Sequence, residues 1–383
     1  MRKPALLALE DGTVFRGFSC GAEGEARGEL VFNTSMTGYQ EVLTDPSYKG
    51  QLVLMTYPLI GNCGITAGDH ESDGTFLEGF VVREMCKVPS NWEAAGSLPD
   101  FLLRRGVPAI EGVDTRALTL RLREKGSLLC ALSTLDLDPK SLAAKARLAP
   151  STSGRDLASL VSCKNGYSWS EPFQEEAGRA VSRRPAGGPR VLVLDYGVKR
   201  GILRALASLG CEVTVLPGNT ATAHDAIRLK ADGVLLSNGP GDPEPLGRAV
   251  ETIRRLLDAR IPLFGICLGH QLLGLALGGK TFKLKFGHHG SNHPVKDLAT
   301  GRVMITSQNH NFCVDLASLP REVRTTHINL NDGTSEGMAH SQLPAFSVQF
   351  HPEACAGPHD ARALFGRFLQ LMPAAEAAEK AHA

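Results

Sequence analysis

The sequence lacks a surplus of either charge, because 41 lysines and arginines face 40 aspartates and glutamates, for a formal net charge of +1 over 383 residues. A chain whose charges balance lacks the surplus of basic residues that typically binds nucleic acid or an anionic membrane surface. No apolar stretch is long enough to span a bilayer, and the N-terminal apolar run ends at Glu10, too early for a signal peptide. We therefore expect a cytoplasmic protein with neither a nucleic-acid nor a membrane partner.

A Cys-x-x-Cys pair is also absent, although the chain has nine cysteines. Their odd number and scattered positions argue against a disulfide framework and a zinc site, and favour a reducing compartment. Hydrophobic residues make up 43% and charged residues 21%, which is typical of a globular protein, and the length suggests two domains.

Apolar periodicity is lost around residue 185, where glycine and proline become frequent, and this loss predicts a domain boundary. The stretch before it contains tryptophan and tyrosine, which indicates a packed connection rather than a loose one. We expect a β-rich α/β domain that docks a partner over residues 1–152, a packed linker over 153–189, a second α/β domain over 190–375, and a tail over 376–383.

Local patterns predict several elements within these domains. An Asp-Gly turn within residues 5–18 favours a β-hairpin, and helices are expected over 98–105 and 115–125, the second ending at Gly126. After residue 190, short apolar strands alternate with helical segments. That alternation predicts a doubly wound, mostly parallel sheet whose ligands bind beyond the carboxyl ends of the strands.

Cys267 has a distinctive setting, because it lies between an apolar strand and a helical segment in a Gly-x-Cys-x-Gly pattern. Such a turn lifts a nucleophile above the sheet edge and near a helix N-terminus, which favours the reactive thiolate. The alternative is a structural core cysteine, since cysteine is often buried. The two glycines favour a nucleophile, because they permit a sharp turn and leave room for a substrate.

A cysteine nucleophile needs a base and a group that holds the base. An apolar alternating strand ends at His351, and Glu353 follows two residues later. We expect His351 to take the thiol proton and return it to the leaving group, while Glu353 fixes its tautomer. The alternative for His351 is a solvated residue in a turn at the end of a strand.

The oxyanion formed during such a reaction needs hydrogen-bond donors. The Leu268 N–H directly follows the nucleophile, which is the usual position for one donor. Gly241 and its neighbours in residues 238–241 could supply the second, because glycine lets backbone approach a substrate. A plain βα turn is the alternative for that segment.

Two further patterns do not indicate sites. Residues 274–281 fit the phosphate-loop pattern, but they end a helix rather than begin one. His288, His289 and His293 share no helical face and have no cysteine or carboxylate beside them in the sequence, so we expect no metal.

These motifs together resemble a known family. Gly-Ile-Cys-Leu-Gly-His-Gln followed downstream by Gln-Phe-His-Pro-Glu is similar to the class I, triad-type glutamine amidotransferases. More closely, the chain resembles the small subunits of carbamoyl-phosphate synthase. The matches that make this resemblance specific cover nearly the whole chain and lie at residues 32–48, 112–116, 236–243, 285–290 and 307–310.

The resemblance implies a flavodoxin-like amidotransferase domain and a triad of Cys267, His351 and Glu353. It implies hydrolysis of L-glutamine to glutamate and ammonia through a cysteine γ-glutamyl thioester. Ammonia would pass through a tunnel to a large subunit, in a heterodimer or a larger assembly. No cofactor is implied for this chain, since the large subunit would use ATP, Mg²⁺ and bicarbonate to make carbamoyl phosphate for arginine and pyrimidine biosynthesis.

The resemblance also implies a set of glutamine-binding residues. The family usually has glycine where this chain has Asn311, and asparagine is the non-glycine residue that best tolerates a positive φ. The family's positions correspond to Ser47, Gly239, Gly241, Leu268, Gln271, Asn309, Asn311 and Phe312.

Two other functions stay open. A standalone cysteine γ-glutamyl hydrolase would share the triad but would need neither the first domain nor a partner. A non-enzymatic regulatory subunit would keep the fold without the chemistry, although such a chain would usually have lost Cys267, His351 or Glu353.

Overall fold

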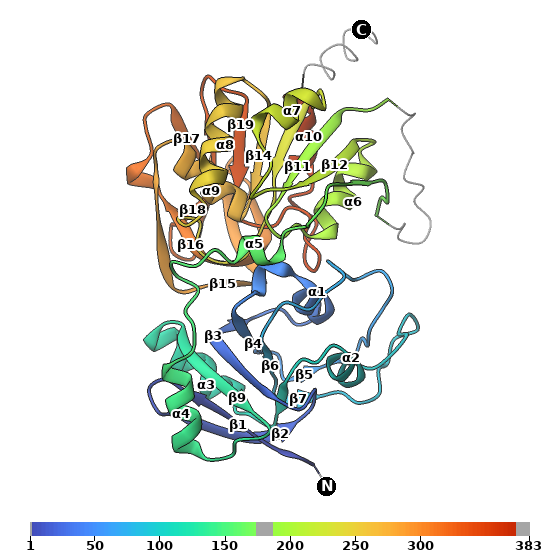
Figure 1. Cartoon of the computed structure of the whole chain (residues 1–383), viewed down its shortest axis with the longest axis vertical. Coiled ribbons are helices and arrows are strands. Elements are labelled where there is room, and N and C mark those ends of the chain that lie inside the picture. The colour runs from blue at the N-terminus through green and yellow to red at the C-terminus, as the bar shows by residue number, and fades with distance from the viewer. Residues whose placement is uncertain (1, 174–186, 373–383) are drawn as a thin grey trace. The chain divides into compact units, whose positions relative to one another are not determined.

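The computed structural model describes residues 2–173 and 187–372, and these form two compact units (Figure 1). The first unit comprises Met1–Leu157 and Leu284–Gly290, and the second comprises Ala158–Lys283 and Ser291–Ala383. The expected tail over 376–383 and residues 174–186 of the expected linker lie outside the described residues. The predicted domain boundaries stay predictions, but no local pattern indicated that residues 284–290 belong with the first unit.

The first unit is built around a closed barrel in the strand order β1-β2-β8-β6-β4-β3-β9. Its elements are β1 (Pro4–Leu9), β2 (Val14–Ser19), β3 (Glu25–Asn33), α1 (Tyr39–Thr44), η1 (Pro46–Tyr48), β4 (Gln51–Met55), β5 (Leu59–Ile60), β6 (Gly79–Val81), β7 (Glu84–Met85), α2 (Leu98–Arg104), β8 (Ala109–Glu111), α3 (Thr115–Lys125), β9 (Leu128–Ser133) and α4 (Pro139–Arg147).

Local signals in this unit predicted the first hairpin and the helices α2 and α3. The hairpin of β1 and β2 pairs Ala8 with Val14 across the Asp-Gly turn, as predicted. Helix α3 has the predicted bounds, since the Asp114 carboxylate accepts from the Ala117 N–H at its start and Gly126 ends it with φ 99°. Barrel closure depends on pairing β9 with both β1 and β3, a long-range choice that local patterns do not encode.

The segment 284–290 belongs to the first unit through backbone hydrogen bonds. The Ser127 N–H donates to the Lys285 carbonyl at 2.8 Å, and the Thr34 N–H donates to the His289 carbonyl at 3.3 Å. The rings of Phe32 and Phe286 also pack with their centroids 5.7 Å apart.

The second unit contains one sheet in the order β10-β12-β11-β13-β14-β19-β18-β17-β15-β16 (Figure 1). Its elements are α5 (Ala158–Val161), β10 (Tyr167–Trp169), β11 (Arg190–Asp195), α6 (Arg200–Ser208), β12 (Glu212–Pro217), α7 (Ala223–Arg228), β13 (Gly233–Leu236), α8 (Gly247–Asp258), β14 (Leu263–Ile266), α9 (Leu268–Ala276), β15 (Lys280–Asp297, which also crosses the first unit), β16 (Val303–Asp315), η2 (Leu316–Ser318), β17 (Val323–Asn329), β18 (Ser335–His340), β19 (Ala345–Val348) and α10 (Ala363–Gln370).

The centre of this sheet is parallel from β12 through β11, β13 and β14 to β19, which confirms the doubly wound fold. Antiparallel partners extend it at both ends, with β10 beside β12 and β18 beside β19. Among described residues no helix has the length and apolar character required to cross a bilayer.

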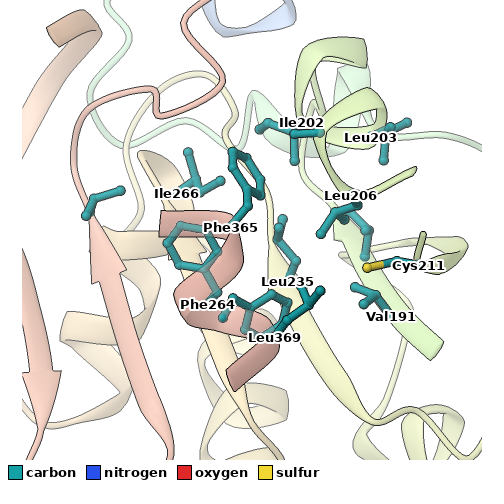
Figure 2. Close-up of a cluster of buried hydrophobic side chains, with 14 of the residues drawn as sticks. Val191, Ile202, Leu203, Leu206, Cys211, Leu235, Phe264, Ile266, Phe365 and Leu369 are labelled. Carbon is teal, nitrogen blue, oxygen red and sulfur yellow. The ribbon is translucent and has the colours of Figure 1, made fainter. Parts of the chain in front are cut away.

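Both faces of the sheet are buried, because successive residues of a strand point to opposite sides. On one face Val191 and Val193 pack with α6 and α10, and Figure 2 shows Leu206 and Phe365 from these helices near Leu235. On the other face the intervening residues of the same strand pack with α7, α8 and α9. The continuous apolar strands recognised in the sequence reflect this double burial.

The phosphate-loop pattern has the wrong structural order. Helix α9 ends at Ala276, Gly278 follows with φ 90°, and β15 begins at Lys280. A phosphate loop requires a strand followed by a helix, so this segment is a helix C-terminus.

Candidate active site

Cys267 forms the turn between β14 and α9. Its φ of 54° and ψ of −104° are rare for a residue with a side chain, and such a conformation costs about 1–3 kcal/mol. The Cys267 N–H donates to the Val348 carbonyl at 2.9 Å, which anchors the turn to β19. A strained turn between a strand and a helix is the geometry that raises a nucleophile above a parallel sheet.

The two flanking glycines have a different role from the one expected. Neither Gly265 nor Gly269 has a positive φ, so the sharp turn is made at the cysteine itself. A Cβ on Gly269 would lie 2.2 Å from the Leu236 carbonyl oxygen, and one on Gly265 would lie 2.6 Å from the Gly269 oxygen. The glycines therefore let the start of α9 pack directly against β13 and β14.

His351 lies three residues beyond β19 and is 2% exposed. Its N–H donates to the Ser307 carbonyl at 2.9 Å, so the backbone of β16 fixes its position. Its Nδ1 lies 2.7 Å from Oε1 of Glu353, which is 0% exposed. The carboxylate fixes the ring so that Nε2 is the nitrogen available for chemistry.

Lys199 completes this arrangement, and the sequence reasoning missed it. Its Nζ donates to Glu353 Oε1 at 2.9 Å and to the Cys355 carbonyl at 2.8 Å, and its side chain is 4% exposed. A buried carboxylate is costly unless cations and hydrogen bonds compensate for its desolvation. The one available signal was a lysine placed just after the carboxyl end of a parallel strand.

The charges of neighbouring groups shift the pKa values of His351 and Glu353. Burial lowers the pKa of His351, but the charge of Glu353, together with the nearby Cys267 and the hydrogen bond to Glu353, outweighs burial and raises the pKa to about 10. Burial raises the pKa of Glu353, but the charges of Lys199 and His351 lower it to about 2. The site therefore favours an imidazolium beside a carboxylate, which is the state reached once the histidine has accepted a proton.

The Cys267 thiol lies close enough to His351 to affect its pKa, yet it points toward β16. Its Sγ donates to the Asn309 carbonyl at 3.5 Å. Among the described residues, the His351 Nε2 has no aligned hydrogen-bond partner. A rotation of the thiol toward Nε2 would pair the two groups, and catalytic hydrogen bonds are often loose before substrate binds.

The two segments expected to hold the oxyanion lie side by side. The Gly269 N–H donates to the Ser237 carbonyl at 3.0 Å, and a Cβ on Gly239 would lie 2.7 Å from the Leu268 side chain. In the described part of the chain, neither the Leu268 N–H nor the Gly241 N–H has a hydrogen-bond acceptor. A free backbone donor next to the nucleophile, with a second in the adjoining segment, suits an oxyanion.

Several predicted glutamine-binding residues also gather near Cys267. Gln271 Nε2 donates to the Phe312 carbonyl at 2.8 Å and to Gln349 Oε1 at 3.2 Å. Both N–H groups of Gln271 are thus used within the protein, so only its Oε1 is available to a ligand. Asn311 lies in β16 without a positive φ, so the tolerance expected of asparagine is not needed.

Ser47 is the one predicted site residue in the first unit. It lies in the short helix η1 and is 5% exposed, and its N–H donates to Asp45 Oδ1 at 2.8 Å. Its role with glutamine stays a prediction.

Comparison with known proteins gives family matches over most of the chain. A model of the class-I glutamine amidotransferases matches residues 192–371, and one of the carbamoyl-phosphate synthase small chain, CPSase domain, matches residues 7–132. The carbamoyl phosphate synthase small chain of Syntrophotalea carbinolica is 56% identical over 371 residues, covering 96% of this chain and 97% of the relative. That of Rhodopirellula baltica is 54% identical over 377 residues, covering 97% and 96%.

Similar solved structures include a glutamine amidotransferase from Thermotoga maritima, with TM-score 0.36 and 20% identity, covering 43% of this chain and 76% of that one.

The doubly wound sheet, the cysteine turn and the matched residues define a class-I glutamine amidotransferase domain. The barrel unit carries the second match, to the small chain of the synthase. The chain belongs to the carbamoyl phosphate synthase small-chain family, whose members are the glutamine-hydrolysing subunits of that synthase.

Proposed function

We propose that this chain hydrolyses L-glutamine through a γ-glutamyl thioester on Cys267 and passes ammonia to a carbamoyl phosphate synthase large subunit. The observation that carries the proposal is the buried His351–Glu353 pair, which leaves the His351 Nε2 without a partner among the described residues, near a cysteine on a strained turn. Family membership supplies the substrate and the partner.

The first half of the reaction forms the thioester. His351 Nε2 accepts the Cys267 proton, and the sulfur attacks the amide carbon of glutamine. The carbonyl oxygen becomes an oxyanion that accepts hydrogen bonds from the Leu268 and Gly241 N–H groups, and one such donor is typically worth about 3 kcal/mol. The imidazolium then gives its proton to the departing nitrogen, and ammonia leaves.

The second half releases glutamate. His351, now neutral, accepts a proton from water, and the hydroxide formed attacks the thioester carbon. Collapse of the second tetrahedral intermediate breaks the carbon–sulfur bond, and the proton returns to Cys267. Glu353 stays ionised throughout, because Lys199 compensates its charge and holds its pKa low.

The supporting groups have defined tasks in this proposal. Gln271, Asn309, Asn311 and Phe312 on α9 and β16 would hold glutamine, with Gly239 beside them, while Ser47 stays a predicted contact of the substrate. ATP and Mg²⁺ would bind to the large subunit, in a heterodimer or a larger assembly, and not to this chain. The cytoplasm suits the reaction, and none of the nine cysteines, all of which lie in the described residues, is placed in a disulfide.

Glutamate release by the purified chain tests the function. We expect slow release by the chain alone and a sharp rise when the large subunit, ATP and bicarbonate are added, with formation of carbamoyl phosphate. Fast release whose rate does not change when the large subunit is added would instead indicate a standalone γ-glutamyl hydrolase. No release under either condition would indicate a regulatory subunit.

A further inference from the structure

Gln349 directly follows β19 and is 0% exposed, although it belongs neither to the triad nor to the predicted substrate contacts. Its N–H donates to the Glu336 carbonyl on β18 at 3.0 Å. Two residues later, the His351 N–H donates to the Ser307 carbonyl on β16 at 2.9 Å. The backbone of this segment, which carries the proposed base, is therefore held by the neighbouring strands.

The orientation of the Gln271 amide on α9 follows from its two partners. Its Nε2 lies 2.8 Å from the Phe312 carbonyl oxygen, which can only accept a hydrogen bond. The amide nitrogen must therefore face Phe312, because the reversed amide would bring two oxygens together. The same Nε2 lies 3.2 Å from the Gln349 amide, so Gln349 must turn its Oε1 toward Gln271. The Phe312 carbonyl thus decides the orientation of both amides.

Two acceptors on one amide nitrogen constrain the amide more than either acceptor alone. A single hydrogen bond would leave the plane of the Gln271 amide free to turn about the axis of that bond. With one N–H on Phe312 and the other on Gln349, the plane is fixed. Both N–H groups are then used, so Gln271 Oε1 is an acceptor in a fixed position. Such an acceptor can form a charge-assisted hydrogen bond with the α-ammonium of glutamine, but not with its α-carboxylate.

The nitrogen of the Gln349 amide is a cost that the oxygen must offset. Gln349 Nε2 is buried and, within the described residues, has no hydrogen-bond partner. A buried donor that is left unpaired is destabilising. A methionine would fill nearly the same space without this cost, but it would offer Gln271 no strong acceptor. The amide oxygen, which holds Gln271, is therefore what a glutamine contributes at this position.

We propose that Gln349 is a positioning residue for glutamine binding, whose amide oxygen fixes Gln271 so that Gln271 Oε1 accepts from the α-ammonium of the substrate. Gln349 acts through Gln271 and takes no part in proton transfer or in bond breaking. The inference rests on the proposed hydrolysis of glutamine, because it concerns the binding of that substrate.

Binding of glutamine without turnover measures this role directly. The chain carrying Cys267→Ser is assembled with the large subunit, and the Kd for L-glutamine is measured by titration calorimetry. Adding Gln349→Met should raise this Kd by roughly tenfold, because the Gln271 amide loses one of its two acceptors. Adding Gln349→Glu should change it by less than about threefold, since a carboxyl group keeps an acceptor whether or not it is protonated. Gln342→Met, at an exposed glutamine before β19, is the matched control and should leave the Kd unchanged.

Three further readouts separate positioning from a structural role. The analogue 4-carbamoylbutanoate lacks the α-ammonium, so Gln349→Met should weaken its binding by less than about twofold. In a Gln271→Ala background, Gln349→Met should change the Kd for L-glutamine by less than about twofold, because the residue that Gln349 holds is gone. In the complex that retains Cys267, Gln349→Met should raise the KM for glutamine and change kcat by less than about twofold.

The outcomes distinguish this inference from the proposed function. If the Cys267→Ser complex binds glutamine but Gln349→Met leaves the Kd unchanged, or weakens glutamine and the analogue equally, the inference is wrong and the function stands. If no glutamine binds, the proposed function and the inference that rests on it both fail. If Gln349→Met does not fold, Gln349→Asn decides between the same outcomes, because its shorter side chain withdraws the acceptor from Gln271 and stays polar.

Discussion

Two buried cysteines, one in each unit, show that burial alone does not define a reactive residue. Cys130 lies in β9 of the barrel and is 0% exposed, while Cys267 lies between β14 and α9 and is 1% exposed. Burial, and then the charges of Glu10 and Glu29, raise the pKa of Cys130. Cys267 instead lies at the N-terminus of α9, near the imidazole of His351, whose orientation the Glu353 carboxylate fixes. These surroundings favour a core residue at Cys130 and support the nucleophile that we propose at Cys267.

The sharpest test of this comparison is serine substitution at both positions. Cys267→Ser should abolish glutamine-dependent carbamoyl phosphate synthesis, because the hydroxyl cannot form the thioester, yet leave ammonia-dependent synthesis intact. Cys130→Ser, the matched control, should keep glutamine-dependent activity. Steady-state synthesis with each nitrogen source gives the answer. If Cys267→Ser reduced synthesis from glutamine and synthesis from ammonia equally, Cys267 would not be a nucleophile whose only task is to release ammonia for the synthase subunit.

The next largest effect should come from His351→Asn, which removes the base that distinguishes the surroundings of Cys267. General acid–base catalysis typically contributes about 10²–10⁴-fold, so glutamine hydrolysis should fall within that range. Association with the large subunit, measured by gel filtration, should not change. If His351→Asn hydrolysed glutamine at close to the wild-type rate, His351 would not be the base of the reaction.

Lys199→Met tests why the second unit tolerates a buried carboxylate beside its cysteine. Breaking a buried ion pair typically costs about 3–5 kcal/mol, so the free energy of unfolding should fall by that order. Lys199 lowers the pKa of Glu353, so its removal lets Glu353 protonate at a higher pH. The acid limb of the pH–rate profile should therefore move upward in pH.

The exposed Lys164→Met is the control for both measurements. It should change neither the free energy of unfolding nor the pH profile. An acid limb that stays in place in Lys199→Met would show that Lys199 does not govern the charge of Glu353.

The smallest effect concerns how tightly the cysteine turn is packed. Gly269→Ala would place a Cβ 2.2 Å from the Leu236 carbonyl, and overpacking of this kind typically costs about 1–3 kcal/mol. In Gly247→Ala, at the start of α8, the added Cβ has no atom from another described part of the chain within 4 Å, so this variant should not destabilise the chain. Denaturant unfolding of both variants checks the difference. Equal stabilities would mean that the glycine is not required for packing.

Much of the candidate site that the structure brings together could be proposed from the sequence, because its signals are local. The glycines around Cys267, the strand that ends at His351 and the glutamate two residues later each lie within a short window. The same holds for α3, whose cap and final glycine indicated its bounds. Local patterns are reliable where backbone geometry depends on neighbouring residues.

Lys199, which sequence reasoning missed, acts across a long separation in the chain. It reaches Glu353 from 154 positions away. Nothing local marks a lysine or a glutamate as buried, since both are usually exposed. The role of Gly269 was misinterpreted for the same reason, because its constraint comes from β13 rather than from its own φ.

The most direct test of the central claim is to trap the covalent intermediate. The complex is mixed with glutamine, quenched in acid during turnover, digested and analysed by mass spectrometry. We predict a γ-glutamyl adduct on the peptide that contains Cys267, absent in Cys267→Ser, and none on the peptide that contains Cys130. Continued turnover with no adduct on Cys267, or an adduct on another cysteine, would contradict the account.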